Sequence, residues 1–328
     1  MLRLPRLRYV RAASAQESAA AAAELGPRGM LVAGGTDLFP KLKRRQMDPD
    51  TLVGLSHLRE LRSVRGSPAA GFVLGALVTL AEAAAHPELA AAVPGYAEAA
   101  GLVSSPPLRN VGTIGGNLCV DTRCNYYDMT YEWRRSIGFC MKKDGDICLV
   151  APGSPRCWAV SSSDTAPMAI ALDATAVLAG PDGERELPVA ALYRDDGIEY
   201  LTKQPHEVLT TLRLPPLDGA RTAYVKLRRR GSIDFPIAGA AVALWLDGPT
   251  VTRARIVLSA VGSHPVETSA ANEFLAGRQL TPEVVSEAAE LAAKPAKPLD
   301  NADLAHYWRK RMVRVVVEQA IEKAAARA

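Results

Sequence analysis

The sequence predicts an α+β protein built from more than one domain. Its 328 residues exceed what one small hydrophobic core usually supports, so two or three domains are expected. Helix and strand patterns alternate around a glycine turn near the N-terminus, whereas the last third passes from β-like segments into helices. We therefore expect a domain of alternating helices and strands over residues 1–216 and an α+β domain over residues 217–328.

The N-terminal elements are marked by a helix start and a helix end. Ser14 and Glu17 have the spacing of a capping box, and Gly26-Pro27 ends the alanine-rich pattern that follows them. Behind it, a short apolar run stops at two glycines before helix-forming residues resume. The sequence therefore predicts a helix at 14–25, a strand at 30–33, a glycine turn at 34–37, a helix at 38–45 and a strand at 51–55.

The central region combines regular elements with a long irregular stretch. Thr79 and Glu82 form a second capping box before an alanine-rich helix, and Pro87 and Pro94 interrupt the region after it. Turn-forming residues dominate from 125 to 157, with little periodicity. We expect a strand at 72–77, a glycine-rich loop at 111–118, a helix at 164–172, a strand at 176–179 and a turn at 180–183.

The last third begins behind a proline-rich linker. The strand pattern at 208–214 runs into Pro215-Pro216, and Gly219 follows within the same linker. Beyond it, β-like alternation gives way to helical periodicity near Pro265. Strands are predicted at 223–227, 238–246 and 251–258, and helices at 270–276, 282–293 and 304–326.

Composition and charge narrow the classes of function. The net charge of +4 is mild and the aromatic content is 5%, so no nucleic-acid partner is expected. The basic runs at 41–45 and 228–230 are interpreted as solvated faces. No apolar run has the length of a membrane span, and the basic N-terminus lacks a signal-peptide core, so we expect a cytoplasmic protein. The five cysteines fit a reducing compartment in which thiols act as ligands.

Two glycine pairs indicate an anion site. Gly34-Gly35 follows a predicted strand and precedes a helix, and Gly115-Gly116 lies between apolar segments. Glycines let backbone N–H groups turn outward toward an anion, and a helix start behind them adds a favourable dipole. Neither pair matches a Walker or GxGxxG pattern, and each alone is more often a plain turn. Together, with threonines beside both, they suit a diphosphate held from two sides, as in a dinucleotide.

Four segments carry a resemblance to a known family. They are AGGTDL at 33–38, RNVGTIGGNLC at 109–119, SSDTAPMAIALDA at 162–174 and KLRRRGSIDFPIAGAAVAL at 226–244. In this order they resemble the flavin-binding subunits of molybdenum hydroxylases of the xanthine dehydrogenase and carbon monoxide dehydrogenase type. The resemblance implies a PCMH-type FAD-binding domain with two α/β subdomains at about 1–57 and 58–216. It also implies a C-terminal α+β domain, over 217–328, like that of carbon monoxide dehydrogenase flavoproteins.

The resemblance also implies a set of FAD-binding residues. Lys226 matches a lysine near the flavin ring, where a cation steadies negative charge, although a strand-edge charge facing water is the alternative. Asp121 and Asp164 match polar contacts to the cofactor. The diphosphate is expected on one side against Val32, Ala33, Gly34, Gly35, Thr36, Asp37 and Leu38, and on the other against Thr113, Gly115, Gly116 and Asn117.

An insert of about thirty residues, at about 122–160, separates two of the family segments. It carries Cys124, Cys140, Cys148 and Cys157 at spacings of 15, 7 and 8 intervening residues. Four thiolates can hold a [4Fe–4S] cluster. A zinc site is the competing interpretation, although no C-x2-C pair is present, and scattered buried cysteines are the third. Cys119 belongs to the family motif itself and is assigned to packing near the flavin.

The insert resembles that of the 4-hydroxybenzoyl-CoA reductase β subunits within this family, which implies a [4Fe–4S] cluster beside the FAD. The aromatic residues expected to shield the cluster from water are Tyr126, Tyr127, Trp133 and Trp158.

The function implied is electron transfer within a molybdenum enzyme. Electrons from a ferredoxin-like donor would pass through FAD to partner subunits with [2Fe–2S] clusters and molybdopterin, in a dimer of heterotrimers. Substrate chemistry then belongs to a partner, so no catalytic residue is expected here. The alternative within the family is a hydroxylase of an N-heterocycle or aldehyde with electrons flowing outward. Outside it, a zinc-stabilised nucleotide-binding or scaffold protein stays open.

Overall fold

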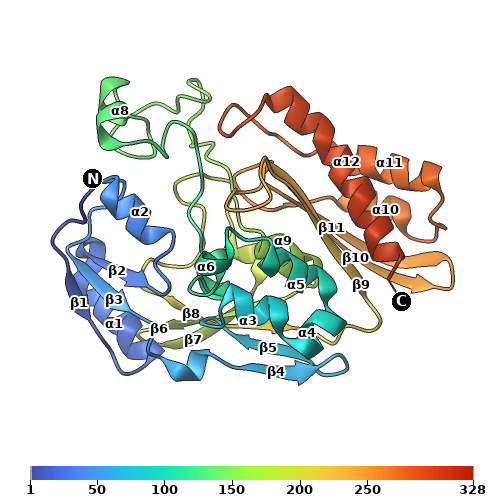
Figure 1. Cartoon of the computed structure of the whole chain (residues 1–328), viewed down its shortest axis with the longest axis horizontal. Coiled ribbons are helices and arrows are strands. Elements are labelled where there is room, and N and C mark those ends of the chain that lie inside the picture. Colours follow the sequence, from blue (N-terminus) through green and yellow to red (C-terminus); the bar gives the residue numbers. More distant parts are fainter. Residues whose placement is uncertain (1, 328) are drawn as a thin grey trace.

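The computed structural model describes residues 2–327 and arranges them as three β-sheets with helices on their faces (Figure 1). A small parallel sheet and a five-stranded antiparallel sheet form the first part. A four-stranded antiparallel sheet with three helices forms the rest of the described chain. This is the predicted α+β class, in which helices and strands alternate in the first part and segregate in the second.

The parallel sheet, with strand order β1-β3-β2, carries the first glycine turn. The Ser14 hydroxyl accepts a hydrogen bond from the Glu17 N–H at 3.1 Å, so the predicted helix start is confirmed. β1 was not predicted, because three residues are too few to show alternation. The elements are β1 Arg8–Val10, α1 Ala15–Leu25, β2 Gly29–Val32, α2 Leu38–Lys43 and β3 Thr51–Gly54.

The five-stranded sheet has the order β4-β5-β8-β6-β7 and is antiparallel throughout. Its two edge strands, β4 and β7, were missed by the sequence prediction. Their side chains are mostly exposed and polar, as on many edge strands, so no apolar run marks them. The strands are β4 Val64–Ser67, β5 Gly71–Gly75, β6 Thr175–Gly180, β7 Gly183–Pro188 and β8 Val208–Leu214.

Short helices follow one another between β5 and β6. The capping box between Thr79 and Glu82 is confirmed, and Pro87 and Pro94 each take the first turn of a new helix. The predicted loop at 111–118 is partly wrong, because Thr113 caps a helix there. The helices are α3 Leu80–Ala85, α4 Pro87–Ala92, α5 Pro94–Gly101, α6 Pro106–Arg109, α7 Ile114–Leu118, α8 Tyr131–Ser136 and α9 Thr165–Ala171; the 3-10 turns are Gly26–Arg28, Arg59–Leu61 and Val189–Leu192.

The third sheet, in the order β12-β11-β10-β9, separates two hydrophobic cores. Ala240, Val242 and Leu244 of β10 face the C-terminal helices, and Ala241 and Ala243 face the opposite core. This period of two is expected of a strand buried on both faces. The elements are β9 Arg221–Leu227, β10 Ala238–Asp247, β11 Thr250–Ser259, β12 Val266–Glu267, α10 Ser269–Leu275, α11 Pro282–Ala293 and α12 His306–Ala325.

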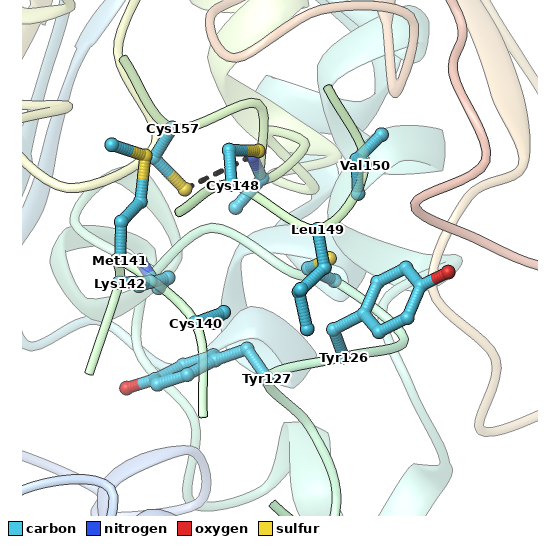
Figure 2. A pocket seen from close by; sticks show the side chains of 11 residues that line it. Tyr126, Tyr127, Cys140, Met141, Lys142, Cys148, Leu149, Val150 and Cys157 are labelled. Carbon is cyan, nitrogen blue, oxygen red and sulfur yellow. Dashed lines mark hydrogen bonds between the residues drawn. The ribbon is translucent and has the colours of Figure 1, made fainter. Parts of the chain in front are cut away.

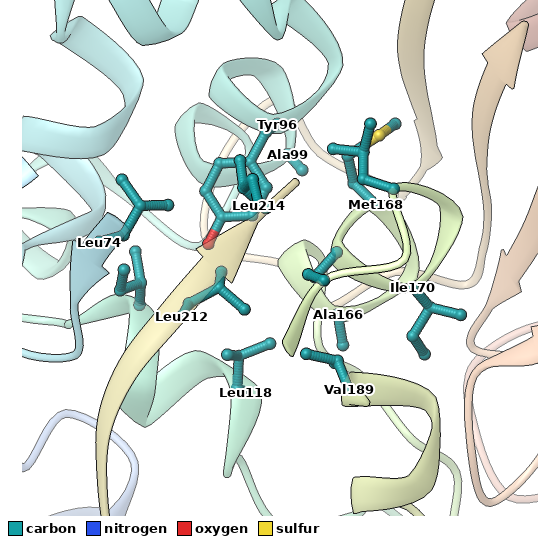
Figure 3. Packing of buried hydrophobic residues seen from close by; sticks show 14 of the residues in the cluster. Leu74, Tyr96, Ala99, Leu118, Ala166, Met168, Ile170, Val189, Leu212 and Leu214 are labelled. Carbon is teal, nitrogen blue, oxygen red and sulfur yellow. The ribbon is translucent and has the colours of Figure 1, made fainter. Parts of the chain in front are cut away.

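The main hydrophobic core lies between the five-stranded sheet and the third sheet. Figure 3 shows side chains from α5, α7, α9 and β8 within this core, among them Tyr96, Leu118, Met168 and Leu212. Fully burying such a side chain contributes about 1.5–3 kcal/mol. Because α7 and α9 belong to this core, the residues at their ends are held in place by packing.

The cysteine insert stands apart from the sheets. It carries α8 and lies above α2 in the view of Figure 1, facing the C-terminal helices across the molecule. Among residues 2–327, no helix is both long and apolar enough to cross a membrane.

Candidate cofactor sites

The first glycine turn links β2 to α2 and presents unpaired backbone donors. Gly35 has a φ of 69°, a left-handed conformation that glycine adopts without a Cβ clash. The backbone N–H groups from Gly34 to Asp37 make no hydrogen bond to any atom of residues 2–327. Successive free N–H groups around a left-handed residue form a concave surface that binds anions. The turn therefore has the donors that a diphosphate requires.

The two predicted glycine loops touch each other. A Cβ placed on Gly34 would lie 2.1 Å from the carbonyl oxygen of Val111 and 2.8 Å from its carbonyl carbon. Only glycine allows this approach of two backbones. The segment before α7 is therefore packed directly against the first turn.

The second glycine pair differs from the prediction, because its N–H groups do not turn outward. Ile114 N–H donates to the Val78 carbonyl and Gly115 N–H to the Ala76 carbonyl, both at 2.9 Å. Gly116 N–H donates to the Thr113 hydroxyl at 3.0 Å. A helix start whose donors are already paired offers no backbone cradle. The expectation of N–H groups facing an anion from both sides is therefore corrected to the first turn alone.

Asn117 ties α7 to α9 within this region. Its Oδ1 accepts hydrogen bonds from the Ser163 hydroxyl at 2.9 Å and the Thr165 hydroxyl at 2.7 Å. The Thr165 N–H donates to the same oxygen at 3.1 Å. Its amide nitrogen has no acceptor within residues 2–327 and is a free hydrogen-bond donor.

Lys226 on β9 is buried, so its interpretation as a charge facing water is wrong. Its ammonium lies 2.8 Å from Asp164 Oδ2 and 3.0 Å from the Leu102 carbonyl oxygen. The Tyr224 hydroxyl donates to Asp164 Oδ1 at 2.8 Å. Burial raises the pKa of Asp164 and lowers that of Lys226, because desolvation disfavours both charged forms, and the ion pair acts against it.

Asp121 is shared by two buried lysines. Its Oδ2 lies 2.8 Å from Lys41 Nζ on α2, and its Oδ1 accepts from Lys142 Nζ at 2.8 Å. Burial opposes ionisation of Asp121, but the two ammonium groups prevail and lower its pKa to about 2. The Lys41 side chain is fully buried, so the interpretation of the 41–45 run as a solvated face is wrong at this residue.

Asp37 connects the first turn to the cysteine insert. Its carboxylate pairs with Arg123, whose guanidinium also lies 3.1 Å from Asp128 Oδ1. The same guanidinium stacks over the Phe235 ring at 4.1 Å. The turn, the start of the insert and the loop after β9 therefore meet at one arginine.

The four cysteines of the insert line one cavity (Figure 2). They come from separate stretches of the insert, are free thiols, and are each less than a tenth exposed. In Figure 2, Tyr126 and Tyr127 lie below Cys148 and Cys157. The cavity is lined by Cys124, Cys140, Cys148, Cys157, Tyr126, Tyr127, Met141, Lys142, Leu149, Val150 and Ala159.

The donor set of this cavity fits a sulfur-ligated metal group. Its lining holds four thiols and no carboxylate or imidazole, the ligand type that iron–sulfur clusters use. The Ala159 N–H donates to Cys157 Sγ at 3.4 Å, the kind of bond that tunes such clusters. Burial raises the pKa of Cys124 to about 12 and that of Cys157 to about 11, so thiolates here require positive charge nearby. Within residues 2–327, no three His, Cys, Asp or Glu side chains are close enough together to bind a single metal ion.

The four aromatic residues expected to shield a cluster lie in different places. Tyr126 and Tyr127 line the cavity, whereas Trp133 and Trp158 do not. Trp158 instead stacks on the Arg156 guanidinium at 3.6 Å. Cys119 lies outside the cavity and packs against the main core; its expected position near the flavin stays a prediction.

The insert is docked on the turn that follows α2, through groups that the sequence prediction missed. Arg134 of α8 is buried and donates to the Arg44 and Arg45 carbonyls, both at 2.9 Å. Gln46 Nε2 donates to the Tyr127 carbonyl at 2.7 Å. These contacts join residues 80 to 90 positions apart in the sequence, so no local sequence pattern predicts them. The turn at the end of α2 therefore supports the insert that carries the cysteine cavity.

Two protein-family models match consecutive parts of the chain. Residues 5–217 match the FAD binding domain in molybdopterin dehydrogenase, and residues 222–324 match the CO dehydrogenase flavoprotein C-terminal domain. The chain is 29% identical over 324 residues to the carbon monoxide dehydrogenase medium chain of Hydrogenophaga pseudoflava, covering 98% of each. It is 25% identical to the glyceraldehyde dehydrogenase medium chain of Sulfolobus acidocaldarius, covering 98% of this chain and 99% of the relative. A solved carbon monoxide dehydrogenase structure from Hydrogenophaga pseudoflava superposes with a TM-score of 0.81 at 29% identity over 99% of both chains.

The fold and the donor loop thus define a flavoprotein that forms part of an oxidoreductase. The chain belongs to the family of FAD-binding subunits of molybdenum hydroxylases, the medium chains of the xanthine oxidase and carbon monoxide dehydrogenase group.

Proposed function

We propose that this chain binds FAD and one [4Fe–4S] cluster as the electron-transfer subunit of a molybdenum-containing complex of the 4-hydroxybenzoyl-CoA reductase type. Electrons from a ferredoxin-like donor pass through it to partner subunits that carry [2Fe–2S] clusters and molybdopterin. The observation that carries the proposal is the convergence of four buried cysteines on one cavity, in an insert docked on the turn at the end of α2.

The FAD diphosphate is assigned to the first glycine turn, where four successive N–H groups are free. Val32 and Leu38 fix the ends of this turn in β2 and α2. On the other side, the segment from Thr113 to Asn117 contributes close packing and the free Asn117 amide rather than backbone donors. A phosphate held by several N–H groups at a helix start is a recurrent arrangement in nucleotide-binding proteins.

Lys226 and Asp164 are assigned to the flavin end of the site. FAD supplies reversible one-electron and two-electron transfer when it is bound. Asp164 and the Leu102 carbonyl hold the Lys226 ammonium in one position, from which it stabilises negative charge nearby. Asp121 is assigned an indirect role, because lysine ammonium groups already pair with both of its carboxylate oxygens.

Partner subunits are proposed from the relatives. The names "medium chain" and "FAD-binding subunit" describe components of larger assemblies. By the same reasoning, substrate chemistry takes place in a partner, and a dimer of heterotrimers is the proposed assembly.

A second function is favoured by the names of the relatives, which include dehydrogenases of carbon monoxide and of an aldehyde. In this alternative, the complex oxidises an aldehyde or an N-heterocycle and electrons leave through this chain. Reconstituting the complex with a low-potential donor and measuring benzoyl-CoA formation from 4-hydroxybenzoyl-CoA separates the two directions. Product formed only from an aldehyde or N-heterocycle, with an added acceptor, would establish the alternative.

Replacing one cavity cysteine tests the cluster. Cys140→Ser removes one of the proposed ligands that line the cavity, so the EPR signal of the dithionite-reduced cluster should disappear while bound FAD is retained. Cys119→Ser is the matched control, because Cys119 lies outside the cavity, and it should keep both signals. A full cubane signal in Cys140→Ser would refute the ligand assignment. Zinc in place of iron, with no flavin absorbance, would exclude both redox functions.

A further inference from the structure

Within residues 2–327, Lys142 is the charged side chain that lines the cysteine cavity. Its side chain is only 5% exposed. Its ammonium donates to Asp121 Oδ1 at 2.8 Å, to the Thr122 hydroxyl at 2.7 Å and to the Gly197 carbonyl. An ammonium has three N–H donors, and these three acceptors occupy them all. The charge of Lys142 is therefore fixed in position beside the cavity.

Lys142 belongs to a buried network of charged groups. Asp121 lies between the ammonium groups of Lys41 and Lys142, and these three residues form a charged trio. Asp128 lies 3.7 Å from Lys41, and Arg123 pairs with both Asp128 and Asp37. The three cations and three carboxylates of this network balance one another. Lys142 is the member of the network that lines the cavity, so the network presents a positive charge there.

The Tyr127 ring lies close to both ammonium groups and also borders the cysteine cavity. Lys41 Nζ lies 4.7 Å and Lys142 Nζ 4.9 Å from the centre of the Tyr127 ring, and that ring also lines the cavity. Tyr127 is 3% exposed, so water does not screen the interaction effectively. Electrostatic effects across such a dry contact are larger than those of surface charges.

We propose that Lys142 sets the reduction potential of the group held by the four cysteines. This rests on the proposed function, in which that group is a [4Fe–4S] cluster. Four thiolate ligands give such a cluster a net negative charge, and net charge is one determinant of its potential. Reduction adds one electron from the donor, breaks no bond and makes the site more negative. A fixed cation stabilises the reduced form more than the oxidised form and thereby raises the potential.

A purely structural role for Lys142 makes a different prediction. Its bonds to Asp121, Thr122 and Gly197 also hold the insert together, and removing them could loosen the cavity without a specific electrostatic effect. Loosening lowers iron content or stability. A shift in potential whose sign follows the sign of the charge change requires the electrostatic role.

Redox titration followed by EPR, on full-length protein with iron and sulfide content measured first, tests the proposal. Lys142→Met should lower the midpoint potential, with at least a tenfold change in the one-electron equilibrium constant, which is about 59 mV. Asp121→Asn removes a negative charge from the same trio and should raise the potential. Lys142→Arg keeps the charge and should stay close to the wild type. Lys143→Met is the matched control, since Lys143 faces Asp48 outside the cavity, and it should leave the potential unchanged.

The outcomes separate this proposal from the proposed function. If the wild type holds no iron–sulfur cluster, the proposed function fails and this inference fails with it. If a cluster is present and the potential is unchanged in both Lys142→Met and Asp121→Asn, or shifts in the same direction in both, only the role of Lys142 is refuted. Should Lys142→Met fail to take up iron, Asp121→Asn and Lys142→Arg decide the question, and an unchanged potential in Asp121→Asn overturns the proposal.

Discussion

Replacing Gly34 with alanine should separate the two loops that meet at the proposed diphosphate site. The added Cβ would lie 2.1 Å from the Val111 carbonyl oxygen, and backbone atoms on both sides cannot rotate away. Restoring an ordinary contact requires a displacement of about 1 Å, which overpacking data associate with a cost of about 1–3 kcal/mol. A shift of that size also stretches an N–H to phosphate hydrogen bond beyond its useful range. One lost bond to a charged acceptor, at about 1.5–3 kcal/mol, weakens FAD binding by about tenfold to somewhat more than a hundredfold.

Titration of FAD into flavin-free protein, followed by the quenching of flavin fluorescence, measures this loss. Gly101→Ala is the matched control, because a Cβ at this end of α5 meets only the Ala84 Cβ at an ordinary 3.6 Å, and its FAD affinity should match the wild type. Circular dichroism establishes that both variants are folded. A folded Gly34→Ala protein with wild-type FAD affinity would show that the turn does not hold the diphosphate.

Two further predictions follow from buried charged groups. Lys226→Met leaves the Asp164 carboxylate buried without its cation, which should cost about 3–5 kcal/mol in urea unfolding at neutral pH. Burial raises the folded-state pKa of Asp164 above its unfolded value. At a pH between these two pKa values, Asp164 is protonated in the folded variant and ionised in the unfolded chain. Its stability should therefore recover as the pH falls through that window, and an equal loss at pH 7 and pH 5 would contradict this. Arg134→Met removes the donor to the Arg44 and Arg45 carbonyls. Since each bond to a charged donor contributes about 1.5–3 kcal/mol, the variant should show amide hydrogen exchange in α8 that is about tenfold faster or more. Unchanged exchange in α8 would show that these two hydrogen bonds do not stabilise the helix.

Local signals in the sequence were sufficient for much of the fold. Capping residues, prolines and apolar periodicity placed α1, α3, α11 and the long strands of the third sheet within a few residues. They failed where a segment depends on its partners. β1 and β4 are short strands that exist through pairing, and β7 is an exposed edge strand with no apolar pattern.

The candidate sites, too, were predicted from the sequence only in part. The residue types at the glycine turn and in the insert predicted an anion site and a thiol site, and the structure shows free N–H groups at the turn and four cysteines around one cavity. The burial of Lys41 and Lys142 could not be foreseen, because charged residues are rarely buried unless they are paired. Their partner Asp121 lies 80 and 21 positions away in the sequence. Likewise, nothing local distinguishes the free N–H groups of the first turn from the paired ones at Gly115 and Gly116.

The amount of iron, acid-labile sulfide and flavin per chain, measured on anaerobically purified protein, tests the central claim most directly. Four cavity cysteines that hold a cubane beside one flavin predict about four iron atoms and four sulfides for each FAD. Flavin without iron, or a single zinc ion in place of the cluster, would contradict the account of the cysteine cavity as an electron-transfer site.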